Sequence, residues 1–186
     1  MASPHAHGFR TPLKAAVFPR IGWHSFGTSS LSFRIAATSS GLYALDFEKA
    51  PRSIRKEKIL PRRTHLLLKR TEFLLKEYLA GRKANFRKLP VDWSGYKKFE
   101  RRVLEELRKI PQGQIETYQS LAKRSGRLRA ARYVGKILGS NRIPVILPCH
   151  RIVPKSGGLG GFSRGVRWKK WLLKLEEACV DTKNRM

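Results

Sequence analysis

Residues 147–151 read Leu-Pro-Cys-His-Arg and place one of the two cysteines of the chain between a proline and a His-Arg pair. Pro148 cannot donate a backbone hydrogen bond, and it favours extended geometry at the residue before it. Cys149 is therefore expected where an extended segment turns. A thiol attacks as its thiolate, and neighbouring cations lower the pKa that limits the thiolate population. The stretch predicts a reactive thiol on a rigid bend.

A structural role for Cys149 has to be weighed beside the reactive one. Free cysteine is among the most buried residue types and commonly packs as a small hydrophobic side chain. The apolar run at 143–147 suits the end of a buried strand. His150 is the immediate neighbour, and adjacent side chains on a strand point to opposite faces. A working Cys149–His150 pair therefore needs a turn in the backbone or a water that relays the proton, and both interpretations stay open here.

Length and cysteine usage set the broad class of the protein. The 186 residues are enough for one domain or two small ones. No apolar run approaches the length of a membrane span, so no membrane partner is expected. Two cysteines without close spacing argue against a disulfide framework or a zinc ribbon and favour a reducing setting. His5, His7 and His24 lack the cysteine partners of a structural zinc site, so no metal is predicted.

The chain is strongly basic, with a formal net charge of +27. Such a charge attracts polyanions and steers them toward the protein. Between Glu116 and Glu176 there is no acidic residue, whereas fourteen Lys and Arg residues lie there and surround Cys149. Positive potential at this place serves both a thiolate and a phosphate backbone. A basic surface without a specific site is the alternative.

The N-terminal half predicts a β-hairpin followed by a helix. Residues 30–36 and 42–47 alternate apolar and polar positions around a Thr-Ser-Ser-Gly turn. Apolar residues recur at helical spacing from 66 to 78, and Gly81 follows as a stop signal. A targeting signal is the alternative for the basic N-terminal segment. The predicted organisation is a basic mobile tail at 1–20, a first domain at 21–92 with a basic linker at 51–63, a second domain at 93–179 and a tail at 180–186.

The C-terminal half is predicted to be mostly helical. A helix over about 117–124, with Thr117 as its N-cap, is followed by a Ser-Gly turn and a second helix over about 129–138. Such a pair is typical of a helix-turn-helix that enters a DNA groove, with a generic helix pair as the alternative. A final helix over about 167–178 carries Glu176 near its end, where the helix dipole disfavours a carboxylate. Glu176 is predicted to pair with a buried partner, His150 being the candidate, or else to lie on the surface.

A glycine-rich segment at 157–163 follows the cysteine. It lacks the Gly-Lys-Ser/Thr ending of a P-loop and the spacing of a dinucleotide-binding motif. Instead it predicts a flexible loop that lets a planar ligand approach the backbone.

Several motifs in one order resemble the O6-alkylguanine-DNA alkyltransferases, or methylated-DNA–protein-cysteine methyltransferases. They run from about Tyr96 to Glu177 and comprise residues 117–122, 131–135, Asn141, 144–153 with its Pro-Cys-His-Arg core, the glycine loop and 171–176. The resemblance implies an α/β (α+β) protein. Its first domain would be a ribonuclease-H-like β-hairpin or sheet plus helix, and its second a mostly helical helix-turn-helix domain of the winged-helix type.

The same resemblance implies the function. The protein is expected to flip an O6-alkylguanine out of double-stranded DNA and to transfer the alkyl (methyl) group irreversibly to its own cysteine, once per molecule. It would need no cofactor and would act as a monomer in the cytoplasm, near the nucleoid in a prokaryote. A non-catalytic sensor of alkyl lesions and a basic DNA-binding protein with an inert thiol are the alternatives.

Catalytic roles follow from the resemblance position by position. Cys149 would accept the alkyl group, His150 would act as a water-mediated base and Glu176 would orient it. Asn141 would tie the recognition helix to the strand that carries Cys149. Tyr118 would hydrogen-bond the guanine and assist its protonation as it leaves.

The remaining site residues are also implied by the resemblance. Arg132 would be the finger that fills the base stack after flipping. The DNA-binding residues would be Arg132, Ala131, Tyr133, Gly135, Lys136, Arg129 and Thr117. The substrate pocket would comprise Pro144, Ile152, Phe162, Ser163, Gly161 and Lys169.

The chain departs from the family pattern at a few positions. Arg142 stands where many relatives have proline, which predicts a looser segment before Cys149. Tyr133 and Lys136 replace small residues on the recognition helix. Phe162 and Arg164 replace common tyrosine and glycine, which predicts an altered pocket wall.

Overall fold

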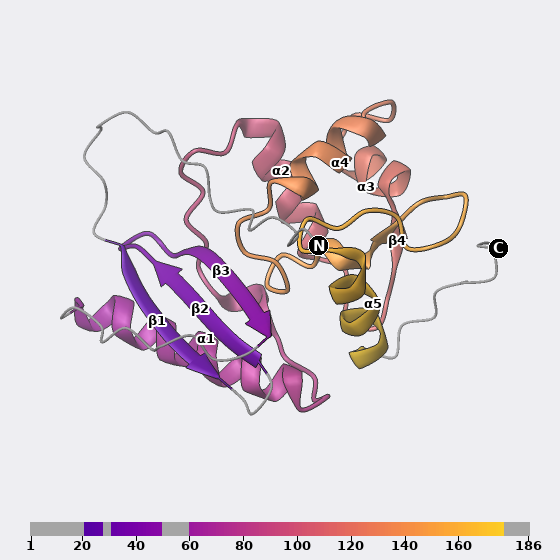
Figure 1. Ribbon diagram of the computed structural model, residues 1–186. Coiled ribbons are helices and arrows are strands. Elements are labelled where there is room, and N and C mark those ends of the chain that lie inside the picture. Colours follow the sequence, from indigo (N-terminus) through magenta and orange to yellow (C-terminus); the bar gives the residue numbers. More distant parts are fainter. Residues whose placement is uncertain (1–20, 28–30, 50–59, 177–186) are drawn as a thin grey trace, which may run out of the picture.

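The computed structural model describes residues 21–27, 31–49 and 60–176. A small sheet with one long helix forms one side of the molecule, and the remaining helices form the other (Figure 1). The strands are β1 (Gly22–Gly27), β2 (Leu31–Ala37), β3 (Leu42–Lys49), β4 (Glu116–Thr117) and β5 (Ile152–Val153). The helices are α1 (Arg62–Leu79), α2 (Lys98–Leu107), α3 (Tyr118–Arg124), α4 (Ala131–Gly139) and α5 (Val166–Leu175), with 3₁₀ turns η1 (Phe86–Lys88) and η2 (Cys149–Arg151).

The first three strands form an antiparallel sheet in the order β1-β2-β3. The predicted hairpin is confirmed, since the Thr38 amide donates to the Gly41 carbonyl at 2.9 Å and closes the turn between β2 and β3. Gly41 has φ +149°, and an added Cβ would lie 2.7 Å from the Pro90 backbone, so the turn requires glycine. Strand β1 was not predicted. Its polar His24 is buried because the ring bonds Glu72 of α1 at 2.6 Å.

One hydrophobic core links this sheet to the C-terminal half. Helix α1 packs on β1 and β2 through buried residues at helical spacing: Thr64, Leu68, Thr71, Leu75 and Tyr78. The ring of Phe47 on β3 lies 6.0 Å from that of Phe33 and contacts Trp168 of α5 edge-on at 4.8 Å. The partly buried Trp168 thus packs α5 against the sheet.

Helices α3 and α4 form the expected helix pair. The hydroxyl of Thr117 accepts a hydrogen bond from the Ser120 amide at 3.1 Å, which confirms the predicted N-cap of α3. The second helix begins later than predicted, at Ala131. A turn in which the Ala130 amide donates to the Arg127 carbonyl at 3.0 Å precedes it, so Arg129 lies in the connection and not on the helix.

The apolar run before the cysteine is a buried turn, and the predicted strand there is wrong. The Leu147 amide donates to the Ile143 carbonyl at 3.0 Å, and Val145 has φ 72°, which β-branched residues rarely adopt. After Cys149 the chain enters β5, which pairs parallel with β4. That pairing places Tyr118, the residue after β4, beside the segment that carries Cys149.

The predicted mixed α/β class is confirmed: an antiparallel sheet with a helix precedes a mostly helical half. Helix α1 starts at Arg62, inside the predicted linker 51–63, and α5 ends at Leu175, before the expected 178. The predicted tails at 1–20 and 180–186 lie outside the described residues, as do most of the linker and Cys179. None of the helices in the described part of the chain has the length and apolar character to cross a membrane.

Candidate active site

Cys149 opens the 3₁₀ turn η2 and is 4% exposed. Asn141, just after α4, donates from its side-chain amide to the Cys149 sulfur at 3.1 Å and to the Leu147 carbonyl at 2.8 Å. Its amide oxygen accepts from the Ile143 backbone at 3.0 Å. Asn141 therefore holds both ends of the buried turn and the sulfur itself. The expected link between the helix and the cysteine segment is present, although that segment is a turn.

The resting thiol is not activated in the way that the sequence predicted. Burial raises the pKa of Cys149, and the Asn141 hydrogen bond and the charges of Lys169 and Arg164 lower it only in part. Neighbouring cations therefore do not outweigh desolvation. Because the sulfur is held mainly as a thiol, it needs a base beside it.

His150 is fully buried, and its Nε2 lies 2.8 Å from Glu176 Oε1. Burial lowers the pKa of His150, and Glu176 offsets this in part. The imidazole is thus held neutral, the form that accepts a proton. Among the described residues, Nδ1 of the same ring has no hydrogen-bond partner. The pairing of His150 with Glu176 leaves Nδ1 as the nitrogen that can take a proton.

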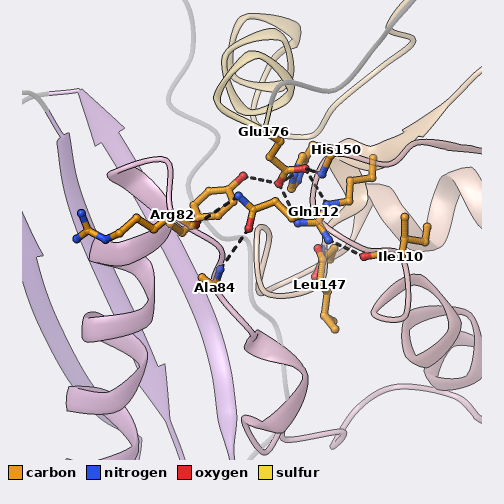
Figure 2. Close-up of polar contacts among 11 residues, drawn as sticks. Arg82, Ala84, Ile110, Gln112, Leu147, His150 and Glu176 are labelled. Atoms are coloured by element: carbon orange, nitrogen blue, oxygen red, sulfur yellow. Dashed lines mark hydrogen bonds and ion pairs between the residues drawn. The ribbon is translucent and has the colours of Figure 1, made fainter.

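Glu176 caps the end of α5 and accepts hydrogen bonds on both oxygens (Figure 2). Oε1 accepts from His150, from Arg151 Nη2 at 2.8 Å and from the Tyr78 hydroxyl at 2.6 Å. Oε2 accepts from Arg151 Nε at 2.9 Å and from the Gly113 amide at 3.2 Å. Burial alone would raise the pKa of Glu176, but the bonds from His150 and Arg151 hold it well below its usual range. Glu176 is therefore a buried, fully ionised carboxylate.

Sequence reasoning missed two members of this cluster. No role was predicted from the sequence for Arg151 of the Pro-Cys-His-Arg core. Its positive charge next to His150, the expected partner of a buried Glu176, was a signal that could have found it. It also donates from Nη1 to the Ile110 carbonyl at 2.6 Å, which anchors it (Figure 2). Tyr78 was assigned to the apolar stripe of its helix, where nothing in the local sequence distinguishes it.

Tyr118 is half-buried at the start of α3 and lies between two glycines. A Cβ added to Gly135 of α4 would be 3.8 Å from its ring, and one added to Gly160 would be 3.7 Å from its hydroxyl. Burial raises the pKa of Tyr118, and the nearby Cys149 adds to this effect. The phenol thus stays protonated near the sulfur and can donate a proton.

A groove of about 470 Å³ opens beside Tyr118. Its lining includes Arg129 and Ala131, which were predicted for DNA binding, and three residues that were not predicted: Gln119, Leu128 and Lys155. Lys155 belongs to the stretch between Glu116 and Glu176 that contains no acidic residue. Its position shortly after Cys149 was the sequence signal that could have placed it at the groove. The groove thus lies between the α3–α4 helix pair and the segment after β5.

The helix α4 exposes Arg132, Tyr133 and Lys136 to solvent. Tyr133 stacks on Phe99 at 5.8 Å between ring centroids, and its hydroxyl donates to Glu100 Oε1 at 3.1 Å. The bulky tyrosine is thus packed against α2. Arg132 and Lys136 remain as exposed cations on this helix.

The predicted pocket residues fall into two groups. Pro144, Ile152 and Lys169 are buried, and the Lys169 amine donates to the Ile152 carbonyl. Burial lowers the pKa of Lys169 to about 8. The second group, Gly161, Phe162 and Ser163, lies in the glycine loop with Phe162 half-buried and its two neighbours exposed.

Arg142 stabilises the segment before Cys149, and the predicted loosening is wrong. Its guanidinium carbon lies 4.3 Å from the ring centroid of Tyr43 and 4.4 Å from that of Tyr96. It also donates to the Ser94 carbonyl at 2.8 Å. Arg164 similarly connects the glycine loop to the sheet through Asp46 Oδ1 at 2.6 Å. Both residues that depart from the family pattern, Arg142 and Arg164, therefore make contacts that anchor their segments.

No group of three or more His, Cys, Asp and Glu residues in the described ranges is arranged to hold a metal ion.

Comparison with known proteins agrees with this geometry. Residues 98–178 match the family model of the 6-O-methylguanine DNA methyltransferase DNA-binding domain. The methylated-DNA–protein-cysteine methyltransferase of Shigella flexneri is 43% identical over 102 residues, which cover 55% of this chain and 59% of that protein. The inducible enzyme of the same name from Bacillus subtilis is 31% identical over 166 residues, covering 86% of this chain and 92% of that protein.

A solved structure shows the same relationship. The crystal structure of Mycobacterium tuberculosis OGT in complex with DNA superposes with a TM-score of 0.67 at 29% identity, covering 83% of this chain and 92% of that one. The similarity therefore extends over the sheet, the helix pair and the cysteine segment. The chain belongs to the family of the methylated-DNA–protein-cysteine methyltransferases.

Proposed function

We propose that this protein repairs DNA by transferring the alkyl group of O6-alkylguanine irreversibly to Cys149. The observation that carries the proposal is the buried series Asn141–Cys149 and His150–Glu176, near Tyr118, which itself lines a groove with basic walls. The Cys149 sulfur is hydrogen-bonded by Asn141, the neutral imidazole of His150 has an Nδ1 that is unbonded among the described residues, and the Glu176 carboxylate orients that ring. This is the arrangement of an activated nucleophile.

The chemical step is a displacement at the alkyl carbon. The thiol proton passes through a water to His150 Nδ1 while Glu176 holds the ring and stabilises the imidazolium that forms. The sulfur bonds to the alkyl carbon as the carbon–O6 bond breaks, and its electron pair stays on the guanine. The Tyr118 hydroxyl donates a proton to the leaving base. The thioether product retains the alkyl group, so each molecule reacts once.

DNA recognition divides between charge and the flipped base. Arg132 on α4 fills the space of the everted nucleotide, which offsets an unstacking cost of a few kcal/mol. Lys136 and Arg129 face the phosphates, so affinity depends on salt and little on sequence. Phe162 and Ser163 border the base in the glycine loop. We assign residues 21–92 and 93–179 as the two domains, and a monomer in the cytoplasm, near the nucleoid if the source is a prokaryote, as the working form.

Intact-mass measurement after incubation with duplex DNA containing O6-methylguanine tests the proposal. The full chain should gain one methyl group. Cys149→Ser should gain none, whereas Cys179→Ser, the matched change at the other cysteine, should still gain one.

The other outcomes identify the competing functions. Tight and selective binding of the lesion with unchanged mass would indicate a non-catalytic sensor. Equal binding of damaged and undamaged duplexes with unchanged mass would indicate a basic DNA-binding protein. Methylation of Cys179 would contradict the assignment of the acceptor.

A further inference from the structure

Tyr78 brings the first half of the chain into direct contact with the reactive cluster. It lies in the last turn of α1 and is fully buried. Its hydroxyl donates to Glu176 Oε1 at 2.6 Å across 98 positions of sequence. The same oxygen bonds His150 Nε2 at 2.8 Å. A tyrosine of the sheet-and-helix half therefore shares one carboxylate oxygen with the imidazole.

The segments around Tyr78 hold this contact in place. Its ring packs edge-on against Phe86 at 5.8 Å. Gln112, next to the Gly113 that bonds Glu176, accepts from the Ala84 amide at 3.3 Å and donates to the Arg82 carbonyl at 3.4 Å (Figure 2). The chain just after α1 is thus joined to the turn that supports the carboxylate.

We propose that Tyr78 is a positioning residue for the alkyl transfer, and that its hydroxyl sets the basicity of His150 through their shared oxygen on Glu176. This inference rests on the proposed function. A donor to an ionised carboxylate withdraws negative charge from the other donors on the same oxygen. With the Tyr78 hydroxyl present, Glu176 stabilises the imidazolium of His150 less than it otherwise would.

Two further charged groups, Arg151 and Lys169, act on the pair of His150 and Glu176. Arg151 contacts Glu176 from η2, and Lys169 acts on His150 from α5; both lower the pKa of His150, whereas Glu176 raises it. Tyr78 contributes the neutral donor from α1, and burial raises its pKa well above the usual value, so it keeps its proton. The hydroxyl therefore acts as a fixed donor over the whole working pH range.

Tyr78→Phe removes the hydroxyl and keeps the ring in the core. The expected result is an upward shift, by about half a pH unit, in the midpoint at which Cys149 becomes reactive, because His150 then holds its proton more strongly. Glu176→Gln should shift the midpoint in the opposite direction. Tyr43→Phe is the matched control, since the Tyr43 hydroxyl is not among the donors to Glu176.

The readout is the rate of adduct formation at Cys149 against pH, measured by peptide mass spectrometry with iodoacetamide and with free O6-benzylguanine. Iodoacetamide reports on the thiol alone. If the wild-type protein reacts with it but gains no methyl group from duplex DNA containing O6-methylguanine, the proposed function fails while the role of Tyr78 is still tested. An unchanged or lowered midpoint in Tyr78→Phe, with either a normal or a reduced maximal rate, overturns the inference.

A second measurement applies even if Tyr78→Phe does not fold. Incorporating 3-fluorotyrosine at position 78 keeps the ring and hydroxyl and makes the hydroxyl a stronger donor. The midpoint should then move downward, opposite to the phenylalanine variant. No movement with the fluorinated residue would also overturn the inference.

Discussion

The buried cluster around Glu176 and the exposed face of α4 use charge in opposite ways. In the cluster, an ionised carboxylate meets the buried side chains of Arg151, His150 and Tyr78 and the half-buried backbone amide of Gly113. On α4, Arg132 and Lys136 project into solvent from a stretch that contains no acidic residue.

The difference determines what each region responds to. Buried pairs are screened little by salt, but they change with protonation and tolerate poorly the loss of one partner. Exposed cations contribute little to folding and act over a distance on a polyanion, with strong dependence on salt. The cluster should therefore respond to pH, and α4 to ionic strength.

The largest expected effect is on the buried cluster. Glu176→Gln leaves Arg151 buried without its counter-charge and should lower the free energy of unfolding by about 3–5 kcal/mol. Urea denaturation measures this. Glu105→Gln, which breaks an exposed ion pair with Arg101 of 2.8 Å, is the control and should cost less than about 1 kcal/mol. Equal losses of unfolding free energy in the two variants would show that a buried charge pair contributes no more to stability than an exposed one.

Acid should destabilise the protein through this cluster and through Glu72 of α1. The pKa of Glu176 is held below its unfolded value of 4.5, and that of Glu72, bonded to Lys76 and His24, is lowered to about 2. A lowered folded pKa contributes stability above pH 4.5 that is lost as the pH falls toward the folded pKa. Urea unfolding at a series of pH values should show this loss, and Glu176→Gln should show less of it. Parallel curves for the two proteins would contradict the assignment.

On α4, Arg132→Ala should slow methyl transfer from duplex DNA by about tenfold or more, since the space of the flipped base is no longer filled. Reaction with free O6-benzylguanine should be unchanged, because no base has to be flipped. Single-turnover rates with both substrates provide the comparison. Equal slowing would show that Arg132 acts on the chemistry.

Arg142 is an intermediate case, a partly buried cation held between two aromatic rings. Arg142→Ala should lower the free energy of unfolding by about 1–2 kcal/mol, because two cation–π contacts are lost. Arg142→Lys keeps the charge without the planar stacking and should recover only part of the loss. Full recovery by lysine in urea denaturation would show that charge alone matters.

The smallest effect is expected for one exposed cation. Lys136→Ala should weaken DNA binding a few-fold and reduce the slope of log affinity against log salt by about one. Fluorescence anisotropy across a salt series measures the slope. Lys69→Ala on α1, whose amine lies 3.4 Å from Glu72, is the control and should leave it unchanged. Steeper salt dependence in Lys136→Ala would contradict its contact with phosphate.

Short-range signals predicted most of the framework. The Thr117 cap, the helix pair and the hairpin depend on residues a few positions apart, so their patterns are visible in the chain. Strand β1 was missed because its polar His24 pairs with Glu72, which belongs to a distant helix. The strand expected before Cys149 is a turn because Asn141 bonds the Leu147 carbonyl and, through its other amide atom, the Ile143 amide.

The site shows the same division. The Pro-Cys-His-Arg core, in one order with the other motifs, was enough to identify the family, since short segments carry that information; Cys149 as the nucleophile stays a prediction. The protonation of those residues depended on packing: burial raises the pKa of Cys149, against the effect of the nearby cations. The meeting of Tyr78 with Glu176 required α1 and α5 to dock over a common core. Desolvation and contacts between distant segments exist only once the chain has folded, and so no local pattern encodes them.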